Sequence, residues 1–214
     1  MLDLLLPPAC LACRAPGELL CRGCRGGLPW LPPARCERCG LPTPCGARCP
    51  AGEAAFERSW APVAYDGTAR ALIHALKLRA LTAAADLMAA QIAAGAPAEL
   101  LAAGTLVPVP GNPRRRRARG FDPAEAIARA LRRRTALPMR PVLRSAAAGP
   151  AQAGAARAQR LRRPAIAVAR QLRGRVILVD DVHTTGATLD ACARALKDAG
   201  TGPVVAVTYA RTLE

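Results

Sequence analysis

The stretch VILVDDVHTTGAT at residues 176–188 decides the fold class, because it joins a buried strand to an acidic pair and a turn into a helix. The largely apolar run from Arg175 to Val179 predicts a central strand, with Asp180 and Asp181 emerging at its end. Small and hydroxylated residues then lead into a helix expected over 186–199, which Gly200 should end. In a parallel sheet, ligands bind where strands end and helices begin, so this stretch is also a candidate site.

Strand and helix patterns alternate through the rest of the chain beyond Gly52. Turn residues separate them: Asp66-Gly67 lies between a strand and a helix, Pro110-Gly111 ends a strand, and Asp122-Pro123 begins a helix. The expected strands are 59–65, 105–109, 142–143 and 204–209, the expected helices are 68–79, 81–94 and 123–134, and a long loop is expected at 145–159. Such alternation predicts an α/β fold with a mostly parallel sheet covered on both faces.

The turn after the central strand has the groups that bind a phosphate monoester. Backbone donors, the helix dipole and hydroxyls converge there, and a glycine lets the backbone approach the ligand closely. The residues concerned are Thr184, Thr185, Gly186, Ala187 and Thr188. Since carboxylates repel phosphate, we expect Asp180 and Asp181 to accept hydrogen bonds from ribose hydroxyls. The pattern therefore predicts a site for ribose 5-phosphate.

A simpler alternative is that Thr184 or Thr185 only caps the helix. A hydrophobic strand, two acids and a Thr-Thr-Gly-x-Thr turn in succession favour the ligand site over a lone cap. The sequence lacks the G-x-x-x-x-G-K-[ST] loop, which argues against an ATPase or GTPase of that kind.

Eight of the nine cysteines form closely spaced pairs near the start of the chain: Cys10/Cys13, Cys21/Cys24, Cys36/Cys39 and Cys45/Cys49. A short spacer lets two thiolates reach one zinc ion, and two pairs complete a tetrahedral site. The pairs predict two structural zinc sites, or one site with spare thiols, and sequential and interleaved pairing are both open. A disulfide framework is the alternative, but no secretory signal is recognised and a large α/β region follows. Cys192 stands apart and is expected to be buried.

The chain of 214 residues has 31 basic and 15 acidic residues, which gives a net charge of +16. Such a surface favours polyanionic partners, although arginine is frequent throughout the sequence and many arginines would only be solvated. Aromatic residues make up 3%, so a bound nucleic acid would be held mainly by its phosphates. No run approaches the roughly 18 apolar residues of a membrane span, and the expected compartment is the cytoplasm.

Several motifs together resemble known proteins. The stretch at 176–188 looks like the phosphoribosyl diphosphate loop of type I phosphoribosyltransferases. The cysteine pairs, Leu106-Val107-Pro108-Val109-Pro110, the run RRRRARGFD at 114–122, and Gln152-Ala153-Gly154 with Arg157 and Arg160 extend the likeness to the ComF family of competence proteins. This resemblance spans nearly the whole chain.

The resemblance implies a zinc-ribbon module at 1–52 and a type I phosphoribosyltransferase-like domain at 53–214. It implies that Val109, Pro110, Gly111 and Asn112 face the pyrophosphate of phosphoribosyl diphosphate, with Mg²⁺ screening its charge. It also implies a flexible loop that carries Gln152, Arg157 and Arg160 and closes over the site. The run Arg114, Arg115, Arg116, Arg117 and Arg119 would hold the pyrophosphate, a nucleic acid, or both.

The sequence departs from the family pattern at three places: Asp122 replaces Asn, Ala155-Ala156 replaces Leu-Ser, and His183 replaces an apolar residue. We expect His183 to be a solvent-facing loop residue rather than a general base, because nothing near it in the sequence would orient it. His74, inside an amphipathic helix, is expected to be structural.

Two functions follow from these features. The first is a phosphoribosyltransferase that transfers ribose 5-phosphate to a nitrogen acceptor; no catalytic residue and no acceptor pocket can be identified. The second, which the resemblance favours, is a protein that binds single-stranded DNA and acts beside a helicase in DNA uptake, with phosphoribosyl diphosphate as a ligand. Arginine clusters at 114–119, 132–134 and 160–163 would then contact phosphates.

Overall fold

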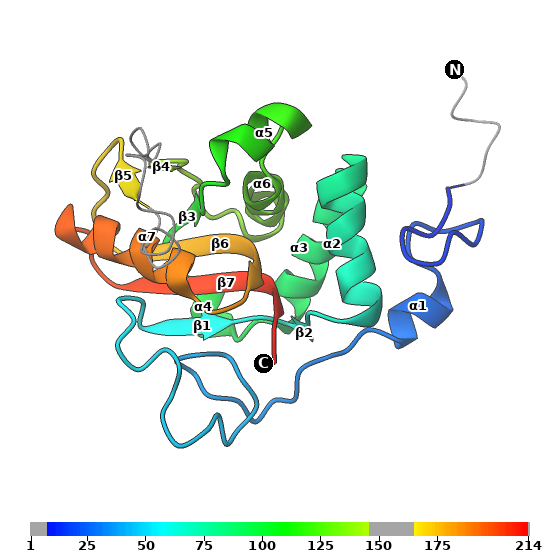
Figure 1. The fold of residues 1–214 in the computed structure, drawn as a ribbon, viewed down its shortest axis with the longest axis horizontal. Coiled ribbons are helices and arrows are strands. Elements are labelled where there is room, and N and C mark those ends of the chain that lie inside the picture. The colour runs from blue at the N-terminus through cyan, green and yellow to red at the C-terminus, as the bar shows by residue number, and fades with distance from the viewer. Residues whose placement is uncertain (1–7, 146–164, 214) are drawn as a thin grey trace, which may run out of the picture.

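The computed structural model describes residues 8–145 and 165–213 (Figure 1). At its centre is a parallel sheet in the order β1-β7-β6-β3, with β2 also paired to β7. The strands are β1 Arg58–Trp60, β2 Val63–Ala64, β3 Thr105–Pro108, β6 Val176–His183 and β7 Val204–Arg211. The predicted α/β class with a mostly parallel sheet is confirmed.

Successive residues of β6 pack into different cores. Ile177 and Val179 belong to the core on one face of the sheet, and Val176 and Leu178 belong to the core on the other. This alternation follows from strand geometry, in which successive side chains point to opposite faces. The sheet is therefore buried on both faces.

Helices cover the two faces unequally. The first face packs against α2 Gly67–Arg79, α3 Ala83–Gly95 and α6 Pro123–Thr135. The second face packs against α7 Ala187–Asp198 and an antiparallel ribbon of β4 Leu143–Ser145 and β5 Ile166–Val168. All four of these helices begin and end within two residues of their predicted bounds.

Other elements differ from the expectation. The strand expected at 59–65 is two short strands, because Pro62 between them has no N–H to continue the ladder. The helices α4 Ala98–Leu101 and α5 Pro113–Arg119 were not predicted.

Strand β6 is longer than its apolar run. Asp180 pairs with Thr208 of β7, and His183 pairs with Arg211. The long partner strand thus continues the backbone ladder beyond Val179, so the acidic pair lies within the strand and the turn begins at Thr184.

The described part of the cysteine-rich segment forms one short helix, α1 Arg22–Gly26, in keeping with its many prolines and glycines. Its first half contributes Leu20 and Leu28 to the core beneath α2. Its second half contributes Cys39 and Ala51 to the core beneath α7. Among the helices of residues 8–145 and 165–213, none has the length and apolar character to cross a membrane.

Candidate ligand cavity and metal centres

The eight N-terminal cysteines form two clusters, each with its four Sγ atoms within 4.8 Å of one another. The first cluster is Cys10, Cys13, Cys21 and Cys24, and the second is Cys36, Cys39, Cys45 and Cys49. Pairing is therefore sequential, which the spacing alone left open. All eight are free thiols, so the disulfide alternative is wrong.

The sulfur positions fit zinc. The Sγ atoms of Cys13 and Cys21 are 3.7 Å apart, and those of Cys36 and Cys49 are 3.8 Å apart. Tetrahedral zinc with Zn–S bonds of about 2.3 Å requires an edge of about 3.8 Å. Each cluster therefore already has the dimensions of a four-thiolate zinc site.

One thiol in each cluster has a lowered pKa. Burial alone would raise it, but hydrogen bonds from backbone N–H groups lower the pKa of Cys10 to about 6 and that of Cys36 to about 7. The thiolate is the form that binds metal, so each cluster has a residue that ionises readily near neutral pH.

A cavity of about 210 Å³ opens where β3 and β6 end. It is lined by the acidic pair Asp180 and Asp181, by Thr188 of α7, by the loop Val109–Asn112, by Arg115, Arg116 and Arg119 of α5, by Lys77 of α2, and by 121–124. Lys77 and two stretches that are far apart in the sequence, 109–124 and 180–188, therefore meet at one edge of the sheet. This is the edge where parallel sheets bind ligands.

The acidic pair lines this cavity. Asp181 N donates to Asp180 Oδ1 at 2.8 Å, and the ammonium of Lys77 forms an ion pair with Asp181 Oδ2. Burial, and then the charge of Asp181, raises the pKa of Asp180 well above its ordinary value. A ligand that brings hydroxyl donors or a cation would stabilise the ionised form of Asp180.

Lys77 is a site residue that the sequence reasoning missed. It follows Leu76 and lies four residues after Ile73, at the edge of the buried stripe of α2. The chain has only two lysines, Lys77 and Lys197, among its 31 basic residues. Its rarity and its position at the border of an apolar helix face could have identified Lys77 as a candidate site residue from the sequence.

The loop after β3 is held in place by Asp122. Gly111 N donates to Asp122 Oδ2 at 2.8 Å, and Ala124 N donates to Asp122 Oδ1 at 3.1 Å. A Cβ at Gly111 would lie 2.7 Å from Asp122 Oδ2, so this close approach requires glycine. Burial raises the pKa of Asp122. Asp122 thus anchors the loop and caps α6.

The arginine run forms the helix α5. Asn112 Oδ1 accepts hydrogen bonds from Arg114 N at 3.0 Å and Arg115 N at 3.4 Å, Pro113 occupies the first turn, and Gly120 ends the helix with φ 78°. Because the run is helical, its arginines are divided between two faces. Arg115, Arg116 and Arg119 line the cavity, while Arg114 and Arg117 are exposed beside it.

The turn into α7 carries the predicted phosphate residues. Thr188 lines the cavity, whereas Thr184, Thr185 and Ala187 are exposed on the turn. Gly186 is the N-cap residue with φ 80°, so the alternative in which Thr184 or Thr185 is the N-cap is wrong. Thr185 Oγ1 lies 3.4 Å from Ala187 N, which is a long contact.

His183 is not a solvent-facing loop residue, because β6 continues through it and leaves it 3% exposed. Its Nδ1 is 3.2 Å from Ser59 Oγ, and its ring lies edge-on to Phe56 at 5.9 Å. Burial, and then the charge of Arg211, lowers the pKa of His183 to about 3. The imidazole is therefore neutral at pH 7 and supports the turn.

The remaining predicted residues lie elsewhere. Gln152, Arg157 and Arg160 fall outside the described residues. Cys192 is buried in the core beneath α7, as predicted. His74 is exposed, with Nε2 3.5 Å from the Tyr65 hydroxyl.

Comparison with known proteins bears on the N-terminal segment. Residues 1–52 match the family model of the double zinc ribbon domain. No curated protein matches the chain. The match and the two four-cysteine clusters together identify the N-terminal segment as a double zinc ribbon, with zinc as its metal.

Proposed function

We propose that the cavity binds phosphoribosyl diphosphate with Mg²⁺, and that residues 53–214 form a phosphoribosyltransferase-like domain. The observation that carries this proposal is the meeting of the acidic pair, Thr188 in the first turn of α7 and the arginine face of α5 around one cavity. The ligand has a phosphate group on either side of its ribose. Each phosphate group would meet arginine side chains or backbone N–H donors, and the ribose between them would meet the carboxylates.

Each part of the ligand has a proposed place. The 5-phosphate binds at Thr184, Thr185, Gly186, Ala187 and Thr188, the ribose hydroxyls donate to Asp180 and Asp181, and the pyrophosphate lies against Val109, Pro110, Gly111 and Asn112. Arg115, Arg116 and Arg119 stabilise the negative charge of the pyrophosphate, and Mg²⁺ would screen it further. When the pyrophosphate approaches, Lys77 can also turn from Asp181 toward it.

Calorimetric titration with phosphoribosyl diphosphate and Mg²⁺ tests the proposal. Asp180→Asn with Asp181→Asn should abolish binding, because neutral amides lose the charge that attracts ribose hydroxyl donors. Asp198→Asn is the matched control, since Asp198 is exposed at the far end of α7. Equal affinity in both variants would show that the ribose site is wrongly placed.

A second proposed activity is the binding of single-stranded DNA. Arg114 and Arg117 are exposed beside the cavity rather than inside it, so they are free to contact a polyanion. Arg133 and Arg134 are less suited, because both contact Asp86 at 2.6 and 3.6 Å. The resemblance to ComF proteins would place this binding in the cytoplasm, in DNA uptake beside a helicase. Gel shifts over a salt series should show affinity falling steeply with salt, and an absent shift excludes this activity.

The alternative is catalysis at the same cavity. A nitrogen acceptor would form a bond to C1 of the ribose while the C1–O bond to pyrophosphate breaks. Positioning and charge stabilisation by the arginines and Mg²⁺ would lower the barrier without a protein nucleophile. Release of pyrophosphate in the presence of a panel of nitrogenous bases distinguishes a transferase from a protein that only binds the ligand.

A further inference from the structure

The buried guanidinium of Arg211 joins the second cysteine cluster to the turn of the candidate phosphate site. Arg211 ends β7 and is 3% exposed. Its Nε donates to the carbonyl of Cys39 at 3.0 Å. Its Nη1 donates to the carbonyl of His183, the last residue of β6, at 2.9 Å and to that of Thr184, the first residue of the turn, at 2.5 Å.

A second set of contacts also connects the second cluster to the turn, through Ser59 and His183. Ser59 N donates to the carbonyl of Glu37, which lies between two zinc ligands, at 3.0 Å. Ser59 Oγ is 3.2 Å from His183 Nδ1, and a Cβ at Gly186 would lie 2.8 Å from His183 Nε2. The second cluster, Ser59, His183 and the turn are therefore in continuous contact.

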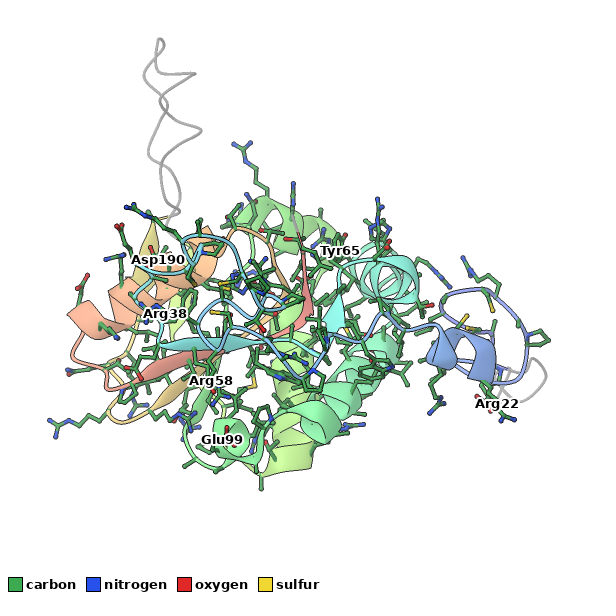
Figure 2. The ribbon with its side chains drawn as sticks, turned by 90° about the horizontal axis from the view of Figure 1, so that it is seen from below. Arg22, Arg38, Arg58, Tyr65, Glu99 and Asp190 are labelled. Atoms are coloured by element: carbon green, nitrogen blue, oxygen red, sulfur yellow. The ribbon has the colours of Figure 1, made fainter. Side chains whose placement is uncertain are left out.

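The first cluster has a different setting. Figure 2 shows Arg22, which is next to Cys21, at the far end of the molecule from Arg38, which is next to Cys39. Arg79 Nη1 of α2 donates to the carbonyl of Leu11, in the loop of this cluster, at 3.5 Å. The two clusters therefore differ in their connection to the turn.

We propose that zinc in the second cluster positions the turn at 183–188, and that Arg211 is the positioning residue that connects them. Loaded with zinc, four thiolates outweigh one divalent cation, so the cluster carries net negative charge that offsets the buried guanidinium. Zinc also fixes the Cys39 carbonyl, which Arg211 needs as an acceptor. A buried guanidinium that loses an acceptor is costly, so loss of zinc should release the contacts to His183 and Thr184.

This inference rests on the proposed function where it concerns ligand affinity. Coupling between sites is reciprocal, so zinc in the second cluster should strengthen phosphoribosyl diphosphate binding, and the ligand should raise the affinity of that cluster for zinc by the same factor. The first cluster should show neither effect.

Matched variants test the coupling in the full chain. Cys45→Ser with Cys49→Ser removes half of the second cluster, and Cys13→Ser with Cys21→Ser removes half of the first. Metal analysis should find one zinc site lost in each. We expect the second-cluster variant to lose at least about fivefold in affinity for phosphoribosyl diphosphate with Mg²⁺, and the first-cluster variant to keep wild-type affinity. Equal affinities, or equal losses, would overturn the inference.

Hydrogen exchange provides a readout without ligand. Amides at 183–188 should exchange faster in the second-cluster variant than in wild type or the first-cluster variant. If wild type does not bind phosphoribosyl diphosphate, the proposed function fails. Unchanged exchange at 183–188 in the second-cluster variant is a separate result, and it would overturn the coupling.

Arg211→Gln keeps all eight zinc ligands, so it tests the connection even if the cysteine variants unfold. We expect this variant to retain both zinc sites by metal analysis, to lose ligand affinity and to show faster exchange at 183–188. Arg211→Lys keeps the charge but cannot donate in the same fork, so it should rescue little. Wild-type exchange in Arg211→Gln would exclude Arg211 as the connection.

Discussion

The contact between Gly186 and His183 constrains the turn at the scale of single residues. Gly186 has φ 80°, and a Cβ there would lie 2.8 Å from His183 Nε2. Gly174 has the same φ, but a Cβ there would meet nothing within 4 Å. The two glycines therefore share a backbone penalty and differ in steric room.

We expect Gly186→Ala to be less stable than Gly174→Ala by about 1–3 kcal/mol, the usual cost of forcing extra volume into a packed site. Gly186→Ala should also weaken phosphoribosyl diphosphate binding, whereas Gly174→Ala should not. Denaturant unfolding and calorimetric titration measure the two effects. Equal stabilities would mean that His183 moves aside without cost.

His183 predicts a pH dependence of stability. Its native pKa of about 3 lies below the ordinary value of 6.5, so below pH 6.5 the unfolded chain binds a proton that the native chain does not. The stability that His183 contributes is thus present above pH 6.5 and is lost as the pH falls. The raised pKa of Asp180 acts in the opposite direction, so a comparison with a His183 variant is needed.

His183→Asn cannot titrate but keeps a polar group beside Ser59. Between pH 7.5 and 5.5, wild type should lose about 1.4 kcal/mol more unfolding free energy than His183→Asn, the amount expected for a group that is protonated only when unfolded. Denaturant unfolding at both pH values measures this difference. Parallel losses in the two proteins would show that His183 already accepts a proton in the native state.

At the scale of elements, α5 divides one basic run between two roles. Arg115 and Arg119 line the cavity, and Arg114 and Arg117 are exposed beside it. Replacing each pair by Gln changes the net charge equally, so any difference reports position rather than charge.

We expect Arg115→Gln with Arg119→Gln to lower phosphoribosyl diphosphate affinity at least about tenfold, since a hydrogen bond to a charged group contributes ~1.5–3 kcal/mol. Arg114→Gln with Arg117→Gln should spare that affinity and instead reduce the salt slope of single-stranded DNA binding by about 0.7 per lost phosphate contact. Calorimetry and gel shifts measure the two effects. Identical profiles for the two double variants would contradict the division of the helix.

The sequence predicted the long elements better than the site that they form. Boundary residues located α6 after Asp122 and α7 before Gly200, and apolar periodicity located α2 and α3, which bury regular stripes. The prediction missed α5, which buries no residue and depends on the cap Asn112, Pro113 and the final Gly120. Strand β6 was predicted too short, because its last residues are polar and are held by the backbone of β7. Lys77 and Arg211 reach the site from other elements, and only the tertiary structure shows which residues they contact.

At the scale of the molecule, the zinc ribbon contributes buried side chains to the cores on both faces of the sheet. Leu20 is 2% exposed and packs in the core beneath α2, while Cys39 of the second cluster is 0% exposed in the core beneath α7. The boundary proposed at residue 52 thus separates two sequence regions that share buried surface. We infer that the ribbon and the α/β domain unfold together.

Leu20→Ala tests this shared core. Truncation of a buried leucine should lower the unfolding free energy of the whole chain by about 2–5 kcal/mol, through lost burial and the cavity left behind. Leu78→Ala is the control, because Leu78 is 72% exposed and its truncation should change stability by less than about 0.5 kcal/mol. Calorimetry of the zinc-loaded protein should show one transition that shifts to lower temperature in Leu20→Ala. If two transitions occur and only the smaller one shifts, the ribbon folds as an independent unit, and its buried leucines do not stabilise the α/β domain.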